Sequence, residues 1–269
     1  MKKKFLTSIC VISMVLAFGA CKDKKNEDEK EEEKNPVKTE QTSEKEEYVV
    51  QESKLAIHAE VGGTVVLGAY EQDGNTENGA EAIEWRVLEV KDGEALLISE
   101  YGLEAMPYND TEEPITWEEC SLRAWLNGEF YEGTFSEDEK EVIVLTKLTN
   151  DDHETKGTEG GNDTKDNVFL LSVDEARLYF GEDEQGADRA YNINRAAKPS
   201  AYAATKPMNT VKNGSWYDGN CPYWLRSPGV VNYIAAIVDY NGDIYDFGHG
   251  VNTEKDMVRP AILIEVTEE

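Results

Sequence analysis

The sequence predicts an α+β fold in a single domain, with mixed and antiparallel strands at both ends and about three helices between them. Segments with a β pattern lie near both ends of the domain, and helix capping boxes lie between them. Asp-Gly and Asn-Gly dipeptides, which are typical of two-residue hairpin turns, separate several strand segments. We therefore expect the terminal strands to pair.

The first part of the domain is predicted to be β-structure. Residues 64–70, 83–90 and 95–99 are rich in β-branched and other apolar side chains. Asp92-Gly93 lies between the second and third of these segments and predicts a hairpin. Residues 73–80 contain two Gly and two Asn and are predicted to form a loop.

Three capping boxes predict helix starts in the middle of the domain, because each places a Ser or Thr three residues before a Glu. The first helix is expected over residues 117–127, ending at Gly128. The third is expected over residues 173–180, ending before Gly181. The three pairs are Thr116/Glu119, Ser136/Glu139 and Ser172/Glu175.

Long loops precede the last strands of the domain. Residues 150–167 are polar and glycine-rich and predict an exposed loop before an apolar strand at 168–171. Compact strands are expected again from residue 222, with Asn241-Gly242 as a two-residue turn. These strands are 223–226, 235–240, 243–247 and 257–266.

The N-terminus has the layout of an export signal. Three Lys precede an apolar run at residues 5–18, and the small residues Gly19 and Ala20 follow it. The run is shorter than the roughly 20 apolar residues that a bilayer span needs. Residues 16–21, with the sequence LAFGAC, resemble the lipobox of bacterial lipoproteins, which implies a lipid on Cys21. The alternative is an ordinary secretory signal with an incidental cysteine.

A charged segment separates Cys21 from the domain. Residues 22–47 are nearly all charged or small and polar, without an aromatic residue, so they cannot bury enough apolar surface to become ordered. We therefore expect a lipoprotein signal peptide at 1–20, a lipidated Cys and disordered tether at 21–60, and the domain at 61–269. The lipid would hold the domain at the extracytoplasmic face of the cell membrane.

The chain is strongly acidic, with 55 Asp and Glu against 27 Lys and Arg and a formal net charge of −28. Most of this excess lies outside the tether. An acidic surface is repelled by phosphate backbones, so we expect no nucleic-acid partner.

Cys120 and Cys221 are the two cysteines that remain without a lipid after processing. An even pair in an oxidising exterior can form a disulfide. The sequence leaves open whether the two residues are bonded or are buried as separate thiols.

Two motifs near the C-terminus, Trp-Leu-Arg-Ser-Pro-Gly at 224–229 and Val-Arg-Pro-Ala at 258–261, carry a family resemblance. They resemble the ending of a bacterial domain family of unknown function, whose members often occur in secreted and surface proteins. The resemblance covers nearly all of residues 63–267. Its upstream segments are 83–88, 95–99, 122–127, 161–164 and 168–172.

The same ending is similar, more distantly, to C-type-lectin-like domains. That group includes the formylglycine-generating enzymes and variable binding proteins that are diversified by retroelements. In this fold a small twisted core displays irregular loops that bear the ligand site. The resemblance therefore implies a single C-type-lectin-like domain that acts as a binding module.

Aromatic residues are concentrated in the last quarter of the chain, interleaved with Asn and Asp. Aromatic faces beside amides and carboxylates suit sugars, which offer both apolar C–H faces and hydroxyl groups. The alternative is that most of these rings are core or hairpin pairs. Arg226 and Arg259 belong to the motifs and are expected to pin the structure. The ligand-binding candidates are the more loop-like residues Trp216, Tyr217, Tyr233, Tyr245 and His249.

Oxygen ligands of the kind that Ca²⁺ prefers gather at residues 162–167. Asp163 and Asp166 are the candidate metal ligands, beside two Asn. Their spacing matches no EF-hand, and such residues also cap turns without a metal. We expect no other cofactor, because the three histidines form no zinc motif.

The sequence contains neither a Gly-x-Ser-x-Gly elbow nor a Gly-rich phosphate loop, so neither motif supports a catalytic function. We therefore expect a membrane-anchored, extracytoplasmic, non-catalytic lipoprotein that binds a glycan, a cell-wall fragment or a surface protein. One alternative is a cell-surface enzyme, either an unrecognised hydrolase or a relative of the formylglycine-generating domains, which would need a close, reactive cysteine pair. Another is a structural or adhesive envelope component.

Overall fold

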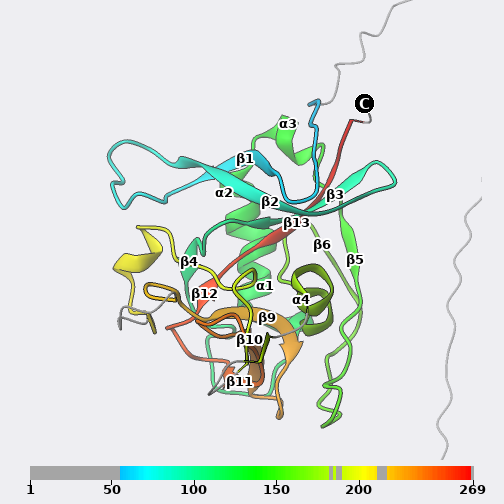
Figure 1. Ribbon diagram of the computed structural model, residues 1–269, viewed down its shortest axis with the longest axis vertical. Helices are drawn as coiled ribbons and strands as arrows, with labels where there is room; N and C mark the ends of the chain where they lie inside the picture. The colour runs from blue at the N-terminus through cyan, green and yellow to red at the C-terminus, as the bar shows by residue number, and fades with distance from the viewer. Residues whose placement is uncertain (1–54, 182–183, 186–189, 211–216, 268–269) are drawn as a thin grey trace, which may run out of the picture. The chain divides into compact units, whose positions relative to one another are not determined.

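The computed structural model describes residues 55–181, 184–185, 190–210 and 217–267 (Figure 1). The expected signal peptide, Cys21 and the tether up to residue 54 lie outside the described residues. Within the described part, no helix has both the length and the apolar character that crossing a membrane requires.

Strands from the two ends of the domain form one antiparallel sheet, in the order β1-β2-β3-β13. β13 pairs with β3 of the N-terminal group, so strands from the two ends of the domain do pair, but β1 and β13 lie at opposite edges of the sheet and do not pair with each other. The turn between β2 and β3 places Asp92 at φ 53° and Gly93 at φ 81°, the left-handed pair that a tight hairpin needs. The strands are β1 (Thr64–Tyr70), β2 (Glu81–Lys91), β3 (Glu94–Ser99) and β13 (Ala261–Glu265).

A second, mixed sheet has the order β11-β10-β9-β12-β4. Its strands pair antiparallel except β9 and β12, which run parallel. The strands are β4 (Glu104–Ala105), β9 (Tyr223–Pro228), β10 (Ile234–Val238), β11 (Ile244–Gly250) and β12 (Met257–Val258).

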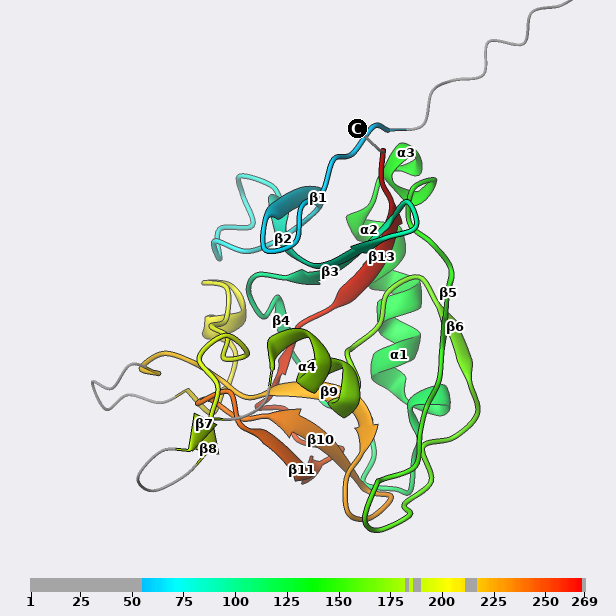
Figure 2. The same cartoon turned by 45° about the vertical axis from the view of Figure 1, so that its right-hand side comes forward.

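The last predicted strand, 257–266, is divided between the two sheets. Arg259-Pro260 separates β12 from β13, and Figure 2 shows this segment passing from the lower sheet to the upper one. Arg259 is buried and joins the sheets, because its Nε donates to Ser99 O at 2.8 Å and its guanidinium also reaches Arg195 O and the Tyr223 hydroxyl. The expectation that Arg259 pins the structure is confirmed.

One helical segment packs against the first sheet and continues past the predicted stop at Gly128. Leu126 and Phe130, on either side of that glycine, are buried, and the Phe130 ring lies 5.3 Å from the Tyr70 ring of β1. Burial of these side chains outweighs the cost of about 1 kcal/mol for a helical glycine. The segment consists of the 3-10 turn η1 (Trp117–Glu119), α1 (Ser121–Trp125), the π turn η2 (Leu126–Phe130) and α2 (Tyr131–Thr134).

Two of the three predicted capping boxes are formed. Ser136 and Ser172 begin α3 (Glu137–Lys140) and α4 (Val173–Phe180), each with reciprocal bonds to the Glu three residues later. The capping box predicted at Thr116 and Glu119 is wrong. The Thr116 side chain caps no backbone group, and Cys120 Sγ instead accepts from the Arg123 N–H at the start of α1.

The predicted loop at 150–167 is partly wrong, because its last residues form a strand. β6 (Thr164–Asp166) pairs with β5 (Thr146–Leu148), and the loop between them extends down beside the second sheet (Figure 2). The predicted strand at 168–171 is fully buried, but only Phe169 forms a bridge, to Ala261. The remaining elements are the pair β7 (Glu184–Gln185) and β8 (Ala190–Tyr191) and the 3-10 turn η3 (Ala203–Thr205).

Candidate functional site

A row of three exposed or half-buried rings lies on β11, a strand at the edge of the second sheet. Tyr245 and Phe247 are 44% and 54% exposed, although large apolar side chains are usually covered. Their ring centroids are 6.0 Å apart and nearly parallel, and the His249 ring lies 6.2 Å from that of Tyr245. These three side chains form what we call the aromatic row.

A β-bulge brings the outer two rings of this row together. Ile237 of β10 faces Tyr245 and Ala235 faces His249, so three residues of β11 lie opposite one residue of β10. Gly248 makes this possible, because it has φ +72° and an added Cβ would lie 2.2 Å from the Ala235 carbonyl oxygen. No other residue type fits there without moving the backbone.

His249 is held by a buried carboxylate. Its Nδ1 lies 2.7 Å from Asp256 Oδ2, and Asp256 has no exposed surface. The hydrogen bond to Asp256 raises the pKa of His249 above its ordinary value. Burial raises the pKa of Asp256 in turn. The outer side of this pair opens into a hollow of about 500 Å³ lined by residues 252–255 and Asn209.

A small cavity, lined mostly by residues of polar type, lies on the other side of β11. Asp246, which alternates with the exposed rings, contributes to its wall, together with residues 149–154, the start of α4 and the end of β9. Its volume is about 50 Å³. Arg226 of β9 forms part of this wall and is held by Glu175, which accepts from both Nη atoms of its guanidinium, and by the Leu170 carbonyl. Arg226 thus pins α4 to β9, as expected.

Three buried polar atoms of residues that line this cavity have no hydrogen-bond partner among the described residues. They are Asn150 Oδ1, His153 Nε2 and Arg226 Nε. The His153 side chain is only 4% exposed, and its Nε2 lies 3.9 Å from Asp246 Oδ2, beyond hydrogen-bond distance. Such atoms are costly to bury, so a cavity that collects three of them is a candidate binding site.

The family comparison covers both of these features. A family profile described as a domain of unknown function, DUF6273, matches residues 92–266. The chain belongs to the DUF6273 family. This match agrees with the resemblance to a family of unknown function and extends from the β2–β3 turn to the end of β13. No curated protein and no solved structure matches the chain. The C-type-lectin-like fold therefore stays a prediction for this DUF6273 domain.

The DUF6273 domain brings together only two of the five predicted ligand-binding residues, Tyr245 and His249. Tyr233 is also exposed, and its carbonyl accepts from the Val251 N–H beside the end of β11. Tyr217 is half-buried and its ring lies 5.1 Å from the ring of Tyr240. Trp216 lies outside the described residues.

Sequence reasoning missed Phe247 and the cavity. Phe247 could have been found, because it follows Tyr245 by two residues in a predicted strand and so shares its face. His153 and Asn150 carried no such signal, since a lone histidine in a polar loop is common and its neighbours come from distant segments.

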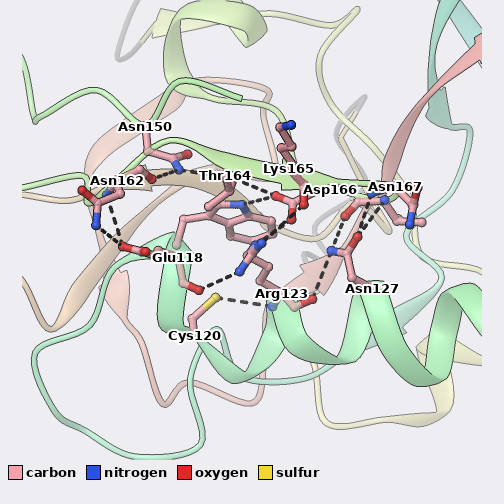
Figure 3. Close-up of polar contacts among 12 residues, drawn as sticks. Glu118, Cys120, Arg123, Asn127, Asn150, Asn162, Thr164, Lys165, Asp166 and Asn167 are labelled. Atoms are coloured by element: carbon pink, nitrogen blue, oxygen red, sulfur yellow. Dashed lines mark hydrogen bonds and ion pairs between the residues drawn. The ribbon is translucent and has the colours of Figure 1, made fainter. Parts of the chain in front are cut away.

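The predicted Ca²⁺ ligands Asp163 and Asp166 are not brought together as a metal site. Asp166 is fully buried, and its oxygens accept from Arg123 Nε at 2.7 Å, Trp117 Nε1 at 3.0 Å and Thr164 Oγ1 at 2.8 Å (Figure 3). Asp163 is paired with Lys147 instead. Protein donors thus reach both oxygens of Asp166, and Ca²⁺ binding by Asp163 and Asp166 stays a prediction.

Among the described residues, the carboxylates of Glu71, Asp73 and Glu81 do lie within 4.8 Å of one another. Backbone N–H groups of residues 72–75 and the Asn78 amide already donate to them. Asx and Glu side chains of this kind commonly close a loop without a metal.

Cys120 and Cys221 are both free and buried, so the disulfide is not formed and the alternative of separate thiols holds. Burial raises the pKa of each thiol to about 12. Since the thiolate is the reactive form, both cysteines are unreactive at neutral pH. The close, reactive pair that a formylglycine-generating activity needs is not present in the described residues.

Proposed function

We propose that this chain is a lipid-anchored, extracytoplasmic binding protein whose lectin-like domain binds glycans through the aromatic row, without catalysing a reaction. The lipid on Cys21 and the charged tether would hold the domain outside the membrane. The observation that carries the proposal is the exposure of Tyr245 and Phe247, stacked at 6.0 Å, at the edge of a sheet.

This arrangement favours a bound ligand, because an exposed apolar sheet edge without one promotes aggregation. Sheet edges recruit other chains unless charge, bulges or covering segments protect them. Here the bulge at Gly248 twists the edge while the rings stay open to solvent. A group of rings with polar neighbours matches the mixed apolar and polar surface of a sugar. Single apolar side chains scattered over a surface would not form such a matching patch.

Acidic charge restricts the ligand further. With a formal net charge of −28, the chain repels anionic polymers, so neutral cell-wall glycans fit better than teichoic or uronic polymers. The partner is thus expected among surface carbohydrates rather than among nucleic acids or anionic lipid headgroups.

The test is an array of glycans and cell-wall fragments probed with the protein and with Tyr245→Ala and Phe247→Ala. Truncating either ring should weaken binding about tenfold or more, since a ring at the centre of a binding site contributes about 2 kcal/mol. Tyr101→Ala is the matched control, because Tyr101 is 42% exposed but follows β3 in the other sheet. No saturable binding to any fragment, or equal loss in the control, would contradict the proposal.

A further inference from the structure

The small cavity beside Asp246 concentrates the buried, unpaired polar atoms of the domain. Among the described residues, buried side-chain atoms without a hydrogen-bond partner occur on Asn150, His153, Arg226 and Asp256, and the first three of these residues line this cavity. Their atoms are two N–H groups, on His153 and Arg226, and one carbonyl oxygen, on Asn150. The carboxylate of Asp246 adds a second acceptor at the mouth, where its side chain is 36% exposed.

The proton position on His153 follows from its backbone contacts. Its Nδ1 accepts from the N–H groups of Thr155 and Lys156, both at 3.3 Å. The neutral ring therefore carries its proton on Nε2, which becomes a donor directed toward Asp246. This tautomer also removes Nε2 as a metal ligand, because ligation needs a free lone pair on that nitrogen.

The residues of the cavity wall thus carry two donors and two acceptors, and this set discriminates among ligands of different charge. A cationic group such as an ammonium has no acceptor and would leave both buried N–H groups unpaired. An anion would have no donor for Asn150 Oδ1 and would face Asp246 and the exposed acids of residues 151–154. A single secondary amide, such as an N-acetyl group, has only one N–H for two acceptors. Two adjacent hydroxyl groups, each donating and accepting, satisfy all four partners.

We propose that this cavity binds a pair of neighbouring hydroxyl groups on an uncharged sugar unit. A volume of about 50 Å³ is enough for a few water-sized groups but far below the roughly 300 Å³ of a pocket that encloses a whole ligand. The cavity therefore holds one edge of the sugar, and the rest of the unit lies outside.

The position of Asp246 connects this cavity to the aromatic row. It lies between Tyr245 and Phe247 in β11, so the row and the cavity occupy the two faces of one strand at the edge of the sheet. The inference rests on the proposed glycan-binding function and names a second contact for that ligand class, made by hydrogen bonds instead of stacking.

The three histidines of the chain provide separate reporters for a test. His153 lines the cavity, His249 belongs to the aromatic row, and His58 is exposed near the start of the described residues. The full chain in detergent micelles, with labelled histidine, is titrated by NMR with uncharged methyl hexosides of the gluco, galacto and manno series. His58→Gln and His249→Gln assign the signals.

We expect at least one uncharged hexoside to shift the His153 signal saturably while His58 stays unmoved. Asp246→Asn should weaken that binding about tenfold, because it replaces a charged acceptor by a neutral one. Asp138→Asn, the same change at an exposed site in α3, should leave it unaltered. The matching glucosaminide and glucuronide, and N-methylacetamide as a neutral amide, should bind at least tenfold more weakly.

The outcomes separate the two proposals. A shift at His249 without one at His153 would overturn the cavity inference and would mean that the cavity holds only water. Glycan binding by the aromatic row would remain intact. A shift at His153 alone would support the cavity and contradict the row. Equal binding of a charged analogue or of the amide would overturn the assigned ligand class. No shift at either residue with any sugar would refute both.

Discussion

Replacing Asp166 by Ala should destabilise the domain far more than the same change at its neighbour Asp163. Asp166 Oδ2 accepts from Trp117 Nε1 and Thr164 Oγ1, and Oδ1 accepts from Arg123 Nε (Figure 3). The contacts tie β6 to η1 and α1. Asp163 is 43% exposed and pairs with Lys147, which is 68% exposed.

The expected magnitude follows from what each change leaves behind. Without Asp166, two buried neutral donors lose their acceptor, at about 1–3 kcal/mol each. Arg123, whose side chain is 25% exposed, can turn partly toward water and so adds less than a fully buried cation. We expect a loss of about 3–5 kcal/mol for Asp166→Ala. Asp163→Ala should cost about 0–1 kcal/mol, as for other exposed ion pairs.

Urea unfolding followed by tryptophan fluorescence measures both values, and thermal melts should show a Tm lowered by roughly 6–20 °C for Asp166→Ala. Each measurement is made with Ca²⁺ and with a chelator. A difference of less than about 1 kcal/mol between the two variants would refute the structural role of Asp166. So would a Ca²⁺-dependent rise in Tm that both substitutions abolish, because it would restore Asp163 and Asp166 as metal ligands.

The remaining predictions concern the anchor and the His249 pair. Metabolic labelling with a fatty acid should mark the chain at Cys21, and Cys21→Ser or globomycin should abolish the label; an unlabelled, exported chain would remove the anchor and leave the domain proposal standing. An NMR titration should give His249 a pKa above the ordinary value of about 6.5, lowered by Asp256→Asn. Because the folded pKa is raised, the pair stabilises the fold below about pH 6.5, and this contribution is lost as the pH rises past the raised pKa; a value unaffected by Asp256→Asn would contradict the assignment.

The sheets were the predictable part of the fold, because their signals are local. Side chains that alternate between buried and exposed mark β2 as a strand, and the Asp92-Gly93 turn that follows it makes β3 its partner. Where the sequence misled, a distant contact decided the outcome. Gly128 does not end the helix because Phe130 is buried against Tyr70, and the Thr116 box fails because Cys120 provides the cap.

The candidate site was predictable only where it lies within one strand. Tyr245 and His249 were found from composition, and strand alternation could have added Phe247. The cavity joins His153 to Asp246 and Arg226, which are far apart in the sequence, and no local pattern marks the three as neighbours. The contacts of Asp166 were unpredictable for the converse reason: a count of oxygen ligands does not reveal that Arg123 and Trp117 donate to this carboxylate.

The two motifs that carry the family resemblance have structural roles in this domain. Trp224 and Leu225 are fully buried, Arg226 binds Glu175, and Arg259 joins the two sheets. The packing of the core therefore restricts which residues these positions can hold. The aromatic row, in contrast, lies between the two motifs, on a strand whose ring-bearing face the core does not constrain. If the row binds a glycan as we propose, side chains there can change the ligand without changing the fold. Under that proposal, residues of β11, rather than the motifs, determine which ligand this DUF6273 chain binds.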